Sequence, residues 1–180
     1  MKRSRLIQLA VLGSAPLLLT GCEEERAAFV YESLDACISA NQLPAQACRD
    51  DFSRAAAQHE QTAPRYVSAS DCEADFGAAR CESGSGSSSG FFVPLMTGYM
   101  IASMLRGGQD WTGNQNSRSP QPLYRTRGSS SWRTSGNILI GSNTGAAKVP
   151  ARASEPAARA VTMSRAGFGS TASARGSWGG

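Results

Sequence analysis

Cysteine is the residue type whose spacing carries the most chemistry in this sequence of 180 residues. Four of the five cysteines, Cys37, Cys48, Cys72 and Cys81, can form two disulfides in three different pairings. Zinc is the competing interpretation, but these cysteines include no Cys-x-x-Cys pair and the chain has one histidine. We therefore expect structural disulfides and no metal or other cofactor. A thiol-exchange pair formed by Cys72 and Cys81 is the alternative role for these residues.

The remaining cysteine, Cys22, ends a segment that is typical of a secretion signal. Three basic residues among the first five are followed by an uncharged run over residues 6–20, which is too short to span a bilayer as a helix. The sequence Leu19-Thr20-Gly21-Cys22 resembles the lipobox of bacterial lipoproteins. This resemblance implies that residues 1–21 are removed as a signal peptide and that Cys22 receives palmitate-type acyl chains. A plain secretory signal followed by a coincidental cysteine is the alternative.

Lipidation of Cys22 predicts where the chain resides. Several acyl chains anchor a protein stably, since each buried methylene contributes about 0.8 kcal/mol. Residue 23 is Glu, and the Asp that favours inner-membrane retention in enteric-type bacteria is missing. We expect a protein of the cell envelope, in the outer membrane and facing the periplasm, with membrane lipid as one partner. The oxidising periplasm also favours the two disulfides.

An approximate repeat organises residues 22–83. The sequences YESLDAC and YVSASDC end at Cys37 and Cys72, 35 residues apart, and each is followed by a second cysteine. This repeat favours pairing within each unit, so that Cys37 bonds to Cys48 and Cys72 bonds to Cys81.

Helix signals lie in the same segment. Ser33 can cap one short helix, the longest helix is expected over residues 45–62, and Ser70 can cap a third that ends at Gly77. So small a core needs covalent support, which disulfides supply at about 2–4 kcal/mol each. The expected fold of residues 22–83 is a small α-helical, disulfide-stapled unit.

A linker and an apolar segment follow. Residues 84–90 are all glycine or serine and predict a flexible linker. Residues 91–106 are strongly apolar, and Pro94 suits the first turn of a helix. We expect a short apolar helix that either packs on the cysteine-rich unit or docks on an envelope protein partner. The residues expected to bind that partner are Phe91, Phe92, Leu95, Met96, Tyr99, Met100 and Met104.

The charges separate along the chain. Acidic residues outnumber basic residues by twelve to five over residues 22–83, whereas residues 84–180 contain two acidic and ten basic residues. Residues 107–180 combine arginine with glycine and serine, and we expect a long, mostly disordered basic tail there. Arginine mixed with aromatics can bind single-stranded nucleic acid. The periplasmic address argues against a nucleic-acid partner and favours anionic envelope surfaces.

The residue types and their spacing in the sequence do not single out a catalytic site. His59 is the only histidine, and no nucleophile is singled out as its partner. The phosphate-loop and zinc-protease motifs are missing from the sequence. We expect His59 at the surface or the edge of the core, no catalytic residues, and a protein that is not an enzyme.

Several stretches carry a family resemblance when taken together. They are the lipobox, the early cysteine pair, TAPRYVSASDCEADFG at 62–77, Cys81, FFVPLMTGYM at 91–100, and RAGFG at 165–169. In this combination the sequence resembles the YgiB-type bacterial lipoproteins, a family classed as domain of unknown function 1190. The match is looser over residues 107–160. The resemblance implies an envelope address and the division into segments described above, and it brings no catalytic residues.

These features predict a cell-envelope lipoprotein, anchored by Cys22, that acts as a non-enzymatic binding or accessory component. The alternative is a thiol-redox or ligase-associated periplasmic accessory protein that uses Cys72 and Cys81, because some members of the family are encoded near a ligase. The sequence leaves the partner and the oligomeric state open.

Overall fold

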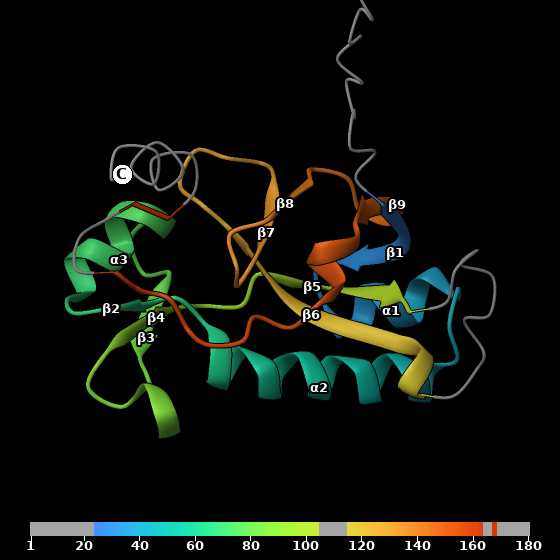
Figure 1. Cartoon of the computed structure of the whole chain (residues 1–180), viewed down its shortest axis with the longest axis horizontal. Helices are drawn as coiled ribbons and strands as arrows, with labels where there is room; N and C mark the ends of the chain where they lie inside the picture. The colour runs from blue at the N-terminus through green and yellow to red at the C-terminus, as the bar shows by residue number, and fades with distance from the viewer. Residues whose placement is uncertain (1–23, 105–114, 164–166, 169–180) are drawn as a thin grey trace, which may run out of the picture.

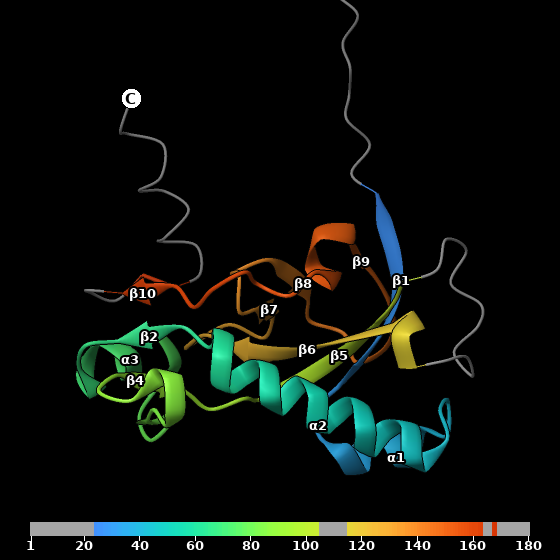
Figure 2. The same cartoon turned by 60° about the horizontal axis from the view of Figure 1, so that its bottom comes forward.

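The computed structural model describes residues 24–104, 115–163 and 167–168, which form two β-sheets and three α-helices (Figure 1). The longest helix, α2, runs along the larger sheet next to β5 and β6, and α1 lies at one end of it (Figure 2). The smaller sheet and α3 lie together at the opposite end of the molecule in both views. The secondary structure in chain order is β1 (Glu25–Tyr31), α1 (Leu34–Ala40), α2 (Ala45–Thr62), β2 (Arg65–Tyr66), α3 (Ala69–Phe76), β3 (Cys81–Ser83), the 3-10 helix η1 (Gly86–Ser88), β4 (Phe92–Pro94), β5 (Gly98–Ser103), η2 (Gln115–Ser117), β6 (Arg118–Arg125), β7 (Trp132–Thr134), β8 (Leu139–Gly141), β9 (Gly145–Pro150), η3 (Ala151–Ser154) and β10 (Thr162–Met163).

The larger sheet has six strands in the order β8-β7-β6-β5-β1-β9, and every neighbouring pair is antiparallel. Its two edge strands, β8 and β9, follow one another in the chain, so the sheet curves into a nearly closed, barrel-like shape. Curvature of this kind lets one face of the sheet enclose its own core, while the other face is covered by helices.

The two central strands are buried on both faces. Along β1, Ala28 and Val30 point into the curved side of the sheet, where Trp132 is the largest residue of the cluster. Phe29 and Tyr31 point to the other side and pack with residues of α1 and α2. Because successive side chains of a strand point to opposite faces, a strand covered on both sides is apolar at nearly every position.

A buried ion pair fixes α2 to the sheet. Asp51 of α2 is fully buried, and its Oδ2 lies 2.8 Å from Nε of Arg118 in β6, whose side chain is 4% exposed. Arg54, one turn further along α2, also contacts the Asp51 carboxylate. Removal of one partner from a buried pair leaves an uncompensated charge, so this contact fixes the position of α2 on β6.

The smaller sheet has the strand order β10-β2-β4-β3, with β10 and β2 parallel and the other pairs antiparallel. It packs with α3 around a third cluster that contains Tyr66, Phe76, Tyr124 and Phe168. Tyr124 belongs to β6, so this cluster joins the smaller sheet to the larger one.

Both disulfides join neighbouring elements. Cys37 of α1 is bonded to Cys48 of α2, and Cys72 of α3 is bonded to Cys81 at the start of β3. This is the pairing that the approximate repeat favoured. Each bond closes a short loop and stabilises the fold mainly by restricting the unfolded chain.

The expected fold class is wrong. The helices themselves lie close to the predicted positions, with Ser33 capping α1, α2 spanning residues 45–62, and Gly77 ending α3. The cap of α3 is Ser68, two residues before the predicted Ser70. Residues 22–83 are nevertheless not an independent helical unit, because Phe29 of β1 and Cys48 of α2 share one core with Tyr99 and Ile101 of β5.

The expected apolar helix over residues 91–106 is also wrong. Residues 92–94 form β4 and residues 98–103 form β5, which is buried along its whole length. Strands that are covered on both faces of a sheet are apolar at nearly every position, as a fully buried helix is. The apolar run alone therefore does not distinguish one buried helix from two buried strands. In the described part of the chain, no helix has both the length and the apolar composition needed to cross a bilayer.

The expected disordered tail over residues 107–180 is largely folded where the structure describes it. Residues 118–150 supply β6 to β9, and η3 follows directly. The composition is poor in aromatics and rich in serine, but this segment completes a sheet whose centre, β1 and β5, comes from earlier in the chain. Its strands are stabilised by that pairing together with a few buried apolar residues, namely Leu123, Trp132 and Val149.

Candidate functional site

An open cavity of about 540 Å³ lies where the end of β6 meets the turn between α3 and β3. Three of its lining residues are arginines, Arg80, Arg125 and Arg127, and they come from separate turns and a strand end. We call this cavity the arginine groove. Its other polar lining residues include Glu32, Thr97 and Ser129.

Arg125 is held in place by two contacts. Its Nη2 lies 3.0 Å from Oε1 of Glu32, which follows β1, and its guanidinium carbon lies 3.5 Å from the ring centre of Trp132. Trp132 is fully buried and is the direct cross-strand partner of Arg125 in the β6–β7 pair. A cation stacked on an indole ring is attracted by the electrons of the ring, so the guanidinium is oriented before any ligand arrives.

Arg127 is presented by a tight turn. Ser129 donates its backbone N–H to the carbonyl of Thr126 at 3.0 Å, and Gly128 has φ +72°. This is the pattern of a type II turn, whose third position requires positive φ and therefore favours glycine. The backbone N–H of Arg127 donates to the carbonyl of Asp75 at 2.6 Å. The turn is thus fastened to α3, with the Arg127 side chain exposed at its tip.

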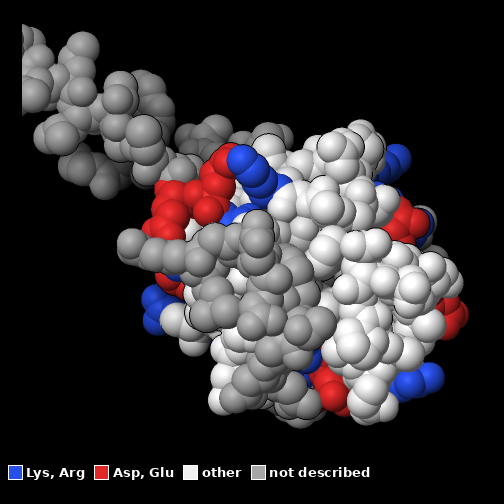
Figure 3. Space-filling view, turned by 90° about the vertical axis from the view of Figure 1, so that its right-hand side faces the viewer, with Lys and Arg blue, Asp and Glu red and all other residues white. Residues whose placement is uncertain are grey.

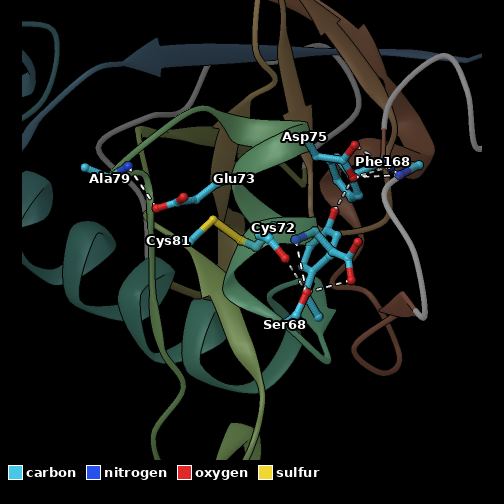
Figure 4. Close-up of a disulfide and its surroundings, with 11 residues drawn as sticks. Ser68, Cys72, Glu73, Asp75, Ala79, Cys81 and Phe168 are labelled. Carbon is cyan, nitrogen blue, oxygen red and sulfur yellow. Dashed lines mark hydrogen bonds between the residues drawn. A yellow bond between two sulfur atoms is a disulfide. The ribbon is translucent and has the colours of Figure 1, made fainter.

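Arg80 is presented by the turn between α3 and β3. Its backbone N–H donates to the carbonyl of Gly77 at 3.2 Å, and Ala79 before it has φ +57°, which is uncommon for a residue with a Cβ. The Glu73 carboxylate accepts from the Ala79 N–H at 3.1 Å, and Cys81 is bonded to Cys72 on α3 (Figure 4). The side-chain cap and the disulfide together stabilise the turn that carries Arg80.

The groove is rich in positive charge that is not neutralised locally. Among the described residues, the Arg80 and Arg127 side chains have no ion-pair or hydrogen-bond partner, whereas Glu32 contacts Arg125. The face at the far end of the molecule, away from α3, looks different (Figure 3). There, acidic and basic side chains lie next to one another around a wide uncharged surface. The arrangement of the groove is suited to an anion.

Asp75 does not line the groove, but its carbonyl holds the turn that carries Arg127 and its carboxylate holds neighbouring residues. Its carboxylate accepts from the hydroxyl of Tyr66 at 2.7 Å and from the backbone N–H groups of Gly167 and Phe168, each at 2.8 Å (Figure 4). Phe168 is buried and lies 5.3 Å from Phe76, between ring centres. Burial raises the pKa of the Tyr66 hydroxyl, and the hydrogen bond to Asp75 raises it further, so Tyr66 remains a donor.

A second cavity, of about 320 Å³, adjoins the end of α2. His59, Glu60 and Glu82 line it, and Nδ1 of His59 lies 2.9 Å from the hydroxyl of Tyr124. Burial lowers the pKa of His59, although the nearby carboxylates of Glu82 and Glu60 act in the opposite direction. Within the described part of the chain, no three His, Cys, Asp or Glu side chains gather closely enough to hold a metal ion.

The residues predicted to bind a partner are not brought together on one surface. Tyr99 and Met100 are both fully buried, on opposite faces of β5. Leu95 and Met104 are 36% and 44% exposed, but one precedes β5 and the other follows it. Phe91, Phe92 and Met96 are half-buried. Cys22, the predicted lipidation site, lies outside the described residues.

The arginine groove was missed because its residues are far apart in sequence. Arg80 lies in the acidic half of the chain and the other two arginines lie in the segment expected to be disordered. The signal that could have found part of it is Thr126-Arg127-Gly128-Ser129, whose glycine at the third position predicts a turn that exposes an arginine.

Comparison with known proteins places these elements in one family. The family model described as Protein of unknown function (DUF1190) matches residues 25–179. A UPF0441 protein of Pectobacterium carotovorum is 32% identical, with 93% of this chain and 81% of the relative aligned. UPF0441 proteins of Erwinia tasmaniensis and Klebsiella pneumoniae are 32% and 30% identical, each with 91% of this chain and 80% of the relative aligned. No solved structure matches the chain.

The match to the family model begins at the first residue of β1 and extends beyond Phe168, so it includes both sheets, both disulfides and the arginine groove. The resemblance drawn from the short sequence stretches is confirmed: this chain belongs to the DUF1190 family.

Proposed function

We propose that this protein is a lipid-anchored component of the cell envelope that acts by binding and not by catalysis. The anchor is Cys22 in the lipobox, and the location that follows from it is the outer membrane, facing the periplasm. Membrane lipid is then one partner, and a ligand or protein held in the arginine groove is the other.

The observation that carries the binding role is the arginine groove itself. It is an open cavity, two of its three arginines have no partner among the described residues, and the turns that carry them are fastened to α3. The turns and the Arg125 guanidinium are held before any ligand arrives, which favours binding because less backbone freedom remains to be lost.

The direction of β1 supports presentation of the groove away from the membrane. The strand begins at Glu25, three positions after Cys22, and ends next to Glu32, which lines the groove. Seven residues of β-strand rise about 3.3 Å each, so the groove lies roughly 23 Å from the anchored end of the strand. An anchored protein of this geometry would offer its groove to the periplasmic space.

Metabolic labelling with palmitate tests the anchor. Cells that produce the wild-type chain should yield a labelled protein in the outer-membrane fraction, and cells that produce Cys22→Ser should yield an unlabelled one. A wild-type chain that is unlabelled and freely soluble would refute the anchor.

Crosslinking in intact envelopes tests the binding role. The double variant Arg80→Ala/Arg127→Ala should lose crosslinked partners that the wild type retains, while Arg49→Ala should retain them. Arg49 is the matched control because it is an exposed arginine on α2 that does not line the groove. An unchanged set of partners in the double variant would contradict the proposal.

The thiol-redox alternative has less support. Cys72 is fully buried and Cys81 is half-buried, so the disulfide is poorly accessible to an attacking thiolate. Mass mapping after alkylation under non-reducing conditions separates the two roles. Two fully formed bonds that resist mild reduction agree with the binding role, and a readily reduced Cys72–Cys81 bond would favour the redox role.

A further inference from the structure

We propose that the arginine groove binds the phosphate group of an organic phosphate ester. This inference rests on the binding role proposed above and names the chemistry of its ligand. Three arginines and one glutamate line the cavity, which leaves an excess of two positive charges. A ligand that neutralises this excess carries about two negative charges, as a phosphate monoester does near neutral pH.

The donors suit phosphate oxygens better than a single carboxylate. Each guanidinium donates in a fixed fork that fits two oxygens side by side, and a phosphate group offers three oxygens whereas a carboxylate offers two. Ser129 adds a hydroxyl: its Oγ accepts the N–H of Ser131 at 3.1 Å, so its own O–H can still donate. Three guanidinium groups and a hydroxyl around one cavity can therefore surround a phosphate from several sides.

The size of the groove indicates an organic ester and not inorganic phosphate alone. A volume of about 540 Å³ falls within the range of roughly 300–1,000 Å³ that is typical of sites for organic ligands. Ala78, which is exposed, also lines the cavity and offers apolar surface beside the arginines. One end of the ligand would thus be held by charge and the other by apolar contact.

Glu32 tunes the affinity. Its carboxylate lies in the groove and pairs with Arg125, so an incoming phosphate must share that guanidinium with it. Replacement by glutamine removes the competing charge and keeps a group of the same shape. Glu32→Gln should therefore bind a phosphate probe more tightly than the wild type.

The source of the phosphate follows from the position of the groove. Roughly 23 Å of strand separates it from the anchored end, whereas the surface potential of a membrane decays over about 8 Å at physiological salt. With β1 directed away from the membrane, as proposed above, the ligand is a soluble ester or a headgroup on an opposing surface, and not a headgroup of the leaflet that holds Cys22.

The test uses the full-length chain reconstituted in phosphatidylcholine vesicles, with inorganic pyrophosphate as the probe and calorimetry as the readout at 0.15 M salt. The wild type should bind the probe with a saturable isotherm. Arg80→Ala/Arg127→Ala should weaken binding by about tenfold or more, since each lost charge-assisted contact contributes more than 1 kcal/mol. Arg49→Ala should leave the affinity unchanged, and Glu32→Gln should increase it.

Either of two results would overturn the inference: an absence of saturable binding, or equal losses of affinity in the double variant and in Arg49→Ala. Because Arg80 and Arg127 are exposed, their removal should leave the thermal unfolding midpoint unchanged, which separates a lost site from a lost fold. The palmitate and crosslinking tests of the proposed function do not depend on this titration, so a failure of the phosphate proposal can be distinguished from a failure of the proposed function.

Competition experiments identify the source of the phosphate. Soluble glycerol phosphate, or phosphatidic acid in separate vesicles, should displace the pyrophosphate. Phosphatidic acid incorporated in the same vesicle as the protein should not displace it. Competition by that third arm alone contradicts the orientation of the groove, and failure of all three arms contradicts a phosphate ester as the ligand.

Discussion

The backbone N–H of Phe168 donates a 2.8 Å hydrogen bond to the carboxylate of Asp75, which lies 93 residues earlier in the chain. The same carboxylate accepts from Tyr66, and the carbonyl of Asp75 accepts from the N–H of Arg127. A single residue of α3 thus holds Gly167 and Phe168, a buried tyrosine and the turn that carries Arg127.

Replacement of Asp75 by alanine should destabilise the protein and weaken the groove. Each hydrogen bond to a charged group contributes about 1.5–3 kcal/mol when buried, and Asp75 is half-buried. We expect the free energy of unfolding to fall by about 2–4 kcal/mol in denaturant titrations. Asp35→Ala, which removes an exposed carboxylate on α1, is the control and should cost little. Equal losses in the two variants would contradict the role given to Asp75.

Asp51→Ala should be among the most damaging substitutions on α2. It leaves the buried Arg118 without its carboxylate, and breaking a buried pair in this way costs about 3–5 kcal/mol. The double variant Asp51→Leu/Arg118→Met removes both charges and should regain much of that loss. Chemical denaturation measures both, and a double variant as unstable as Asp51→Ala alone would show that packing, and not charge, holds α2 to β6.

Gly98→Ala should affect both stability and the groove. A Cβ at Gly98 would lie 2.8 Å from the carbonyl oxygen of Tyr31 and 2.9 Å from the ring of Trp132, on which Arg125 stacks. We expect a loss of about 1–3 kcal/mol from overpacking, together with weaker binding of pyrophosphate. Gly136→Ala is the matched control, because a Cβ there meets only ordinary contacts at 3.8 Å and beyond. Normal stability in Gly98→Ala would argue against the close packing of Trp132.

His59 should make the protein less stable in mild acid. Burial places its folded-state pKa below the ordinary value of 6.5, so as the pH falls through that value the unfolded chain takes up a proton that the folded chain resists. Stability is therefore fully present above pH 6.5 and is lost as the pH falls toward the folded-state pKa. His59→Gln should flatten this part of the profile in denaturant titrations between about pH 7.5 and 5.5. Because the chain has one histidine, an unchanged slope in the variant would contradict the assignment.

Local signals predicted the helices because each helix is defined by nearby residues. Ser33 caps α1, Gly77 ends α3, and α2 has the predicted bounds. The buried face of α2 was harder to predict. Asp51 lies at its centre, and a carboxylate is not expected in a core unless its partner is known. That partner, Arg118, is 67 residues away.

The strands β4 and β5 could not be predicted from the sequence, because their burial also depends on elements that are distant in the chain. The stretch from Phe91 to Met104 is apolar at nearly every position, so it lacks the alternation that distinguishes a half-buried strand from a helix. The alternation is hidden because β5 contacts α2 on one face and the interior of the curved sheet on the other.

The separation of charge along the chain also has a structural explanation. The acidic half and the basic half pair within one fold, through Asp51 with Arg118 and Glu32 with Arg125. The segment predicted to be a basic tail supplies, in part, the basic partners of these ion pairs. The two arginines of the groove that have no partner among the described residues, Arg80 and Arg127, could be recognised only after the turns that carry them were placed together.

The most direct test of the arginine groove is an amide NMR titration of the full-length chain in non-ionic detergent with pyrophosphate. The account predicts that shift changes concentrate in the two turns, residues 77–80 and 125–129, and saturate together with the calorimetric isotherm. Changes spread over exposed arginines such as Arg49, without saturation in those two turns, would contradict it.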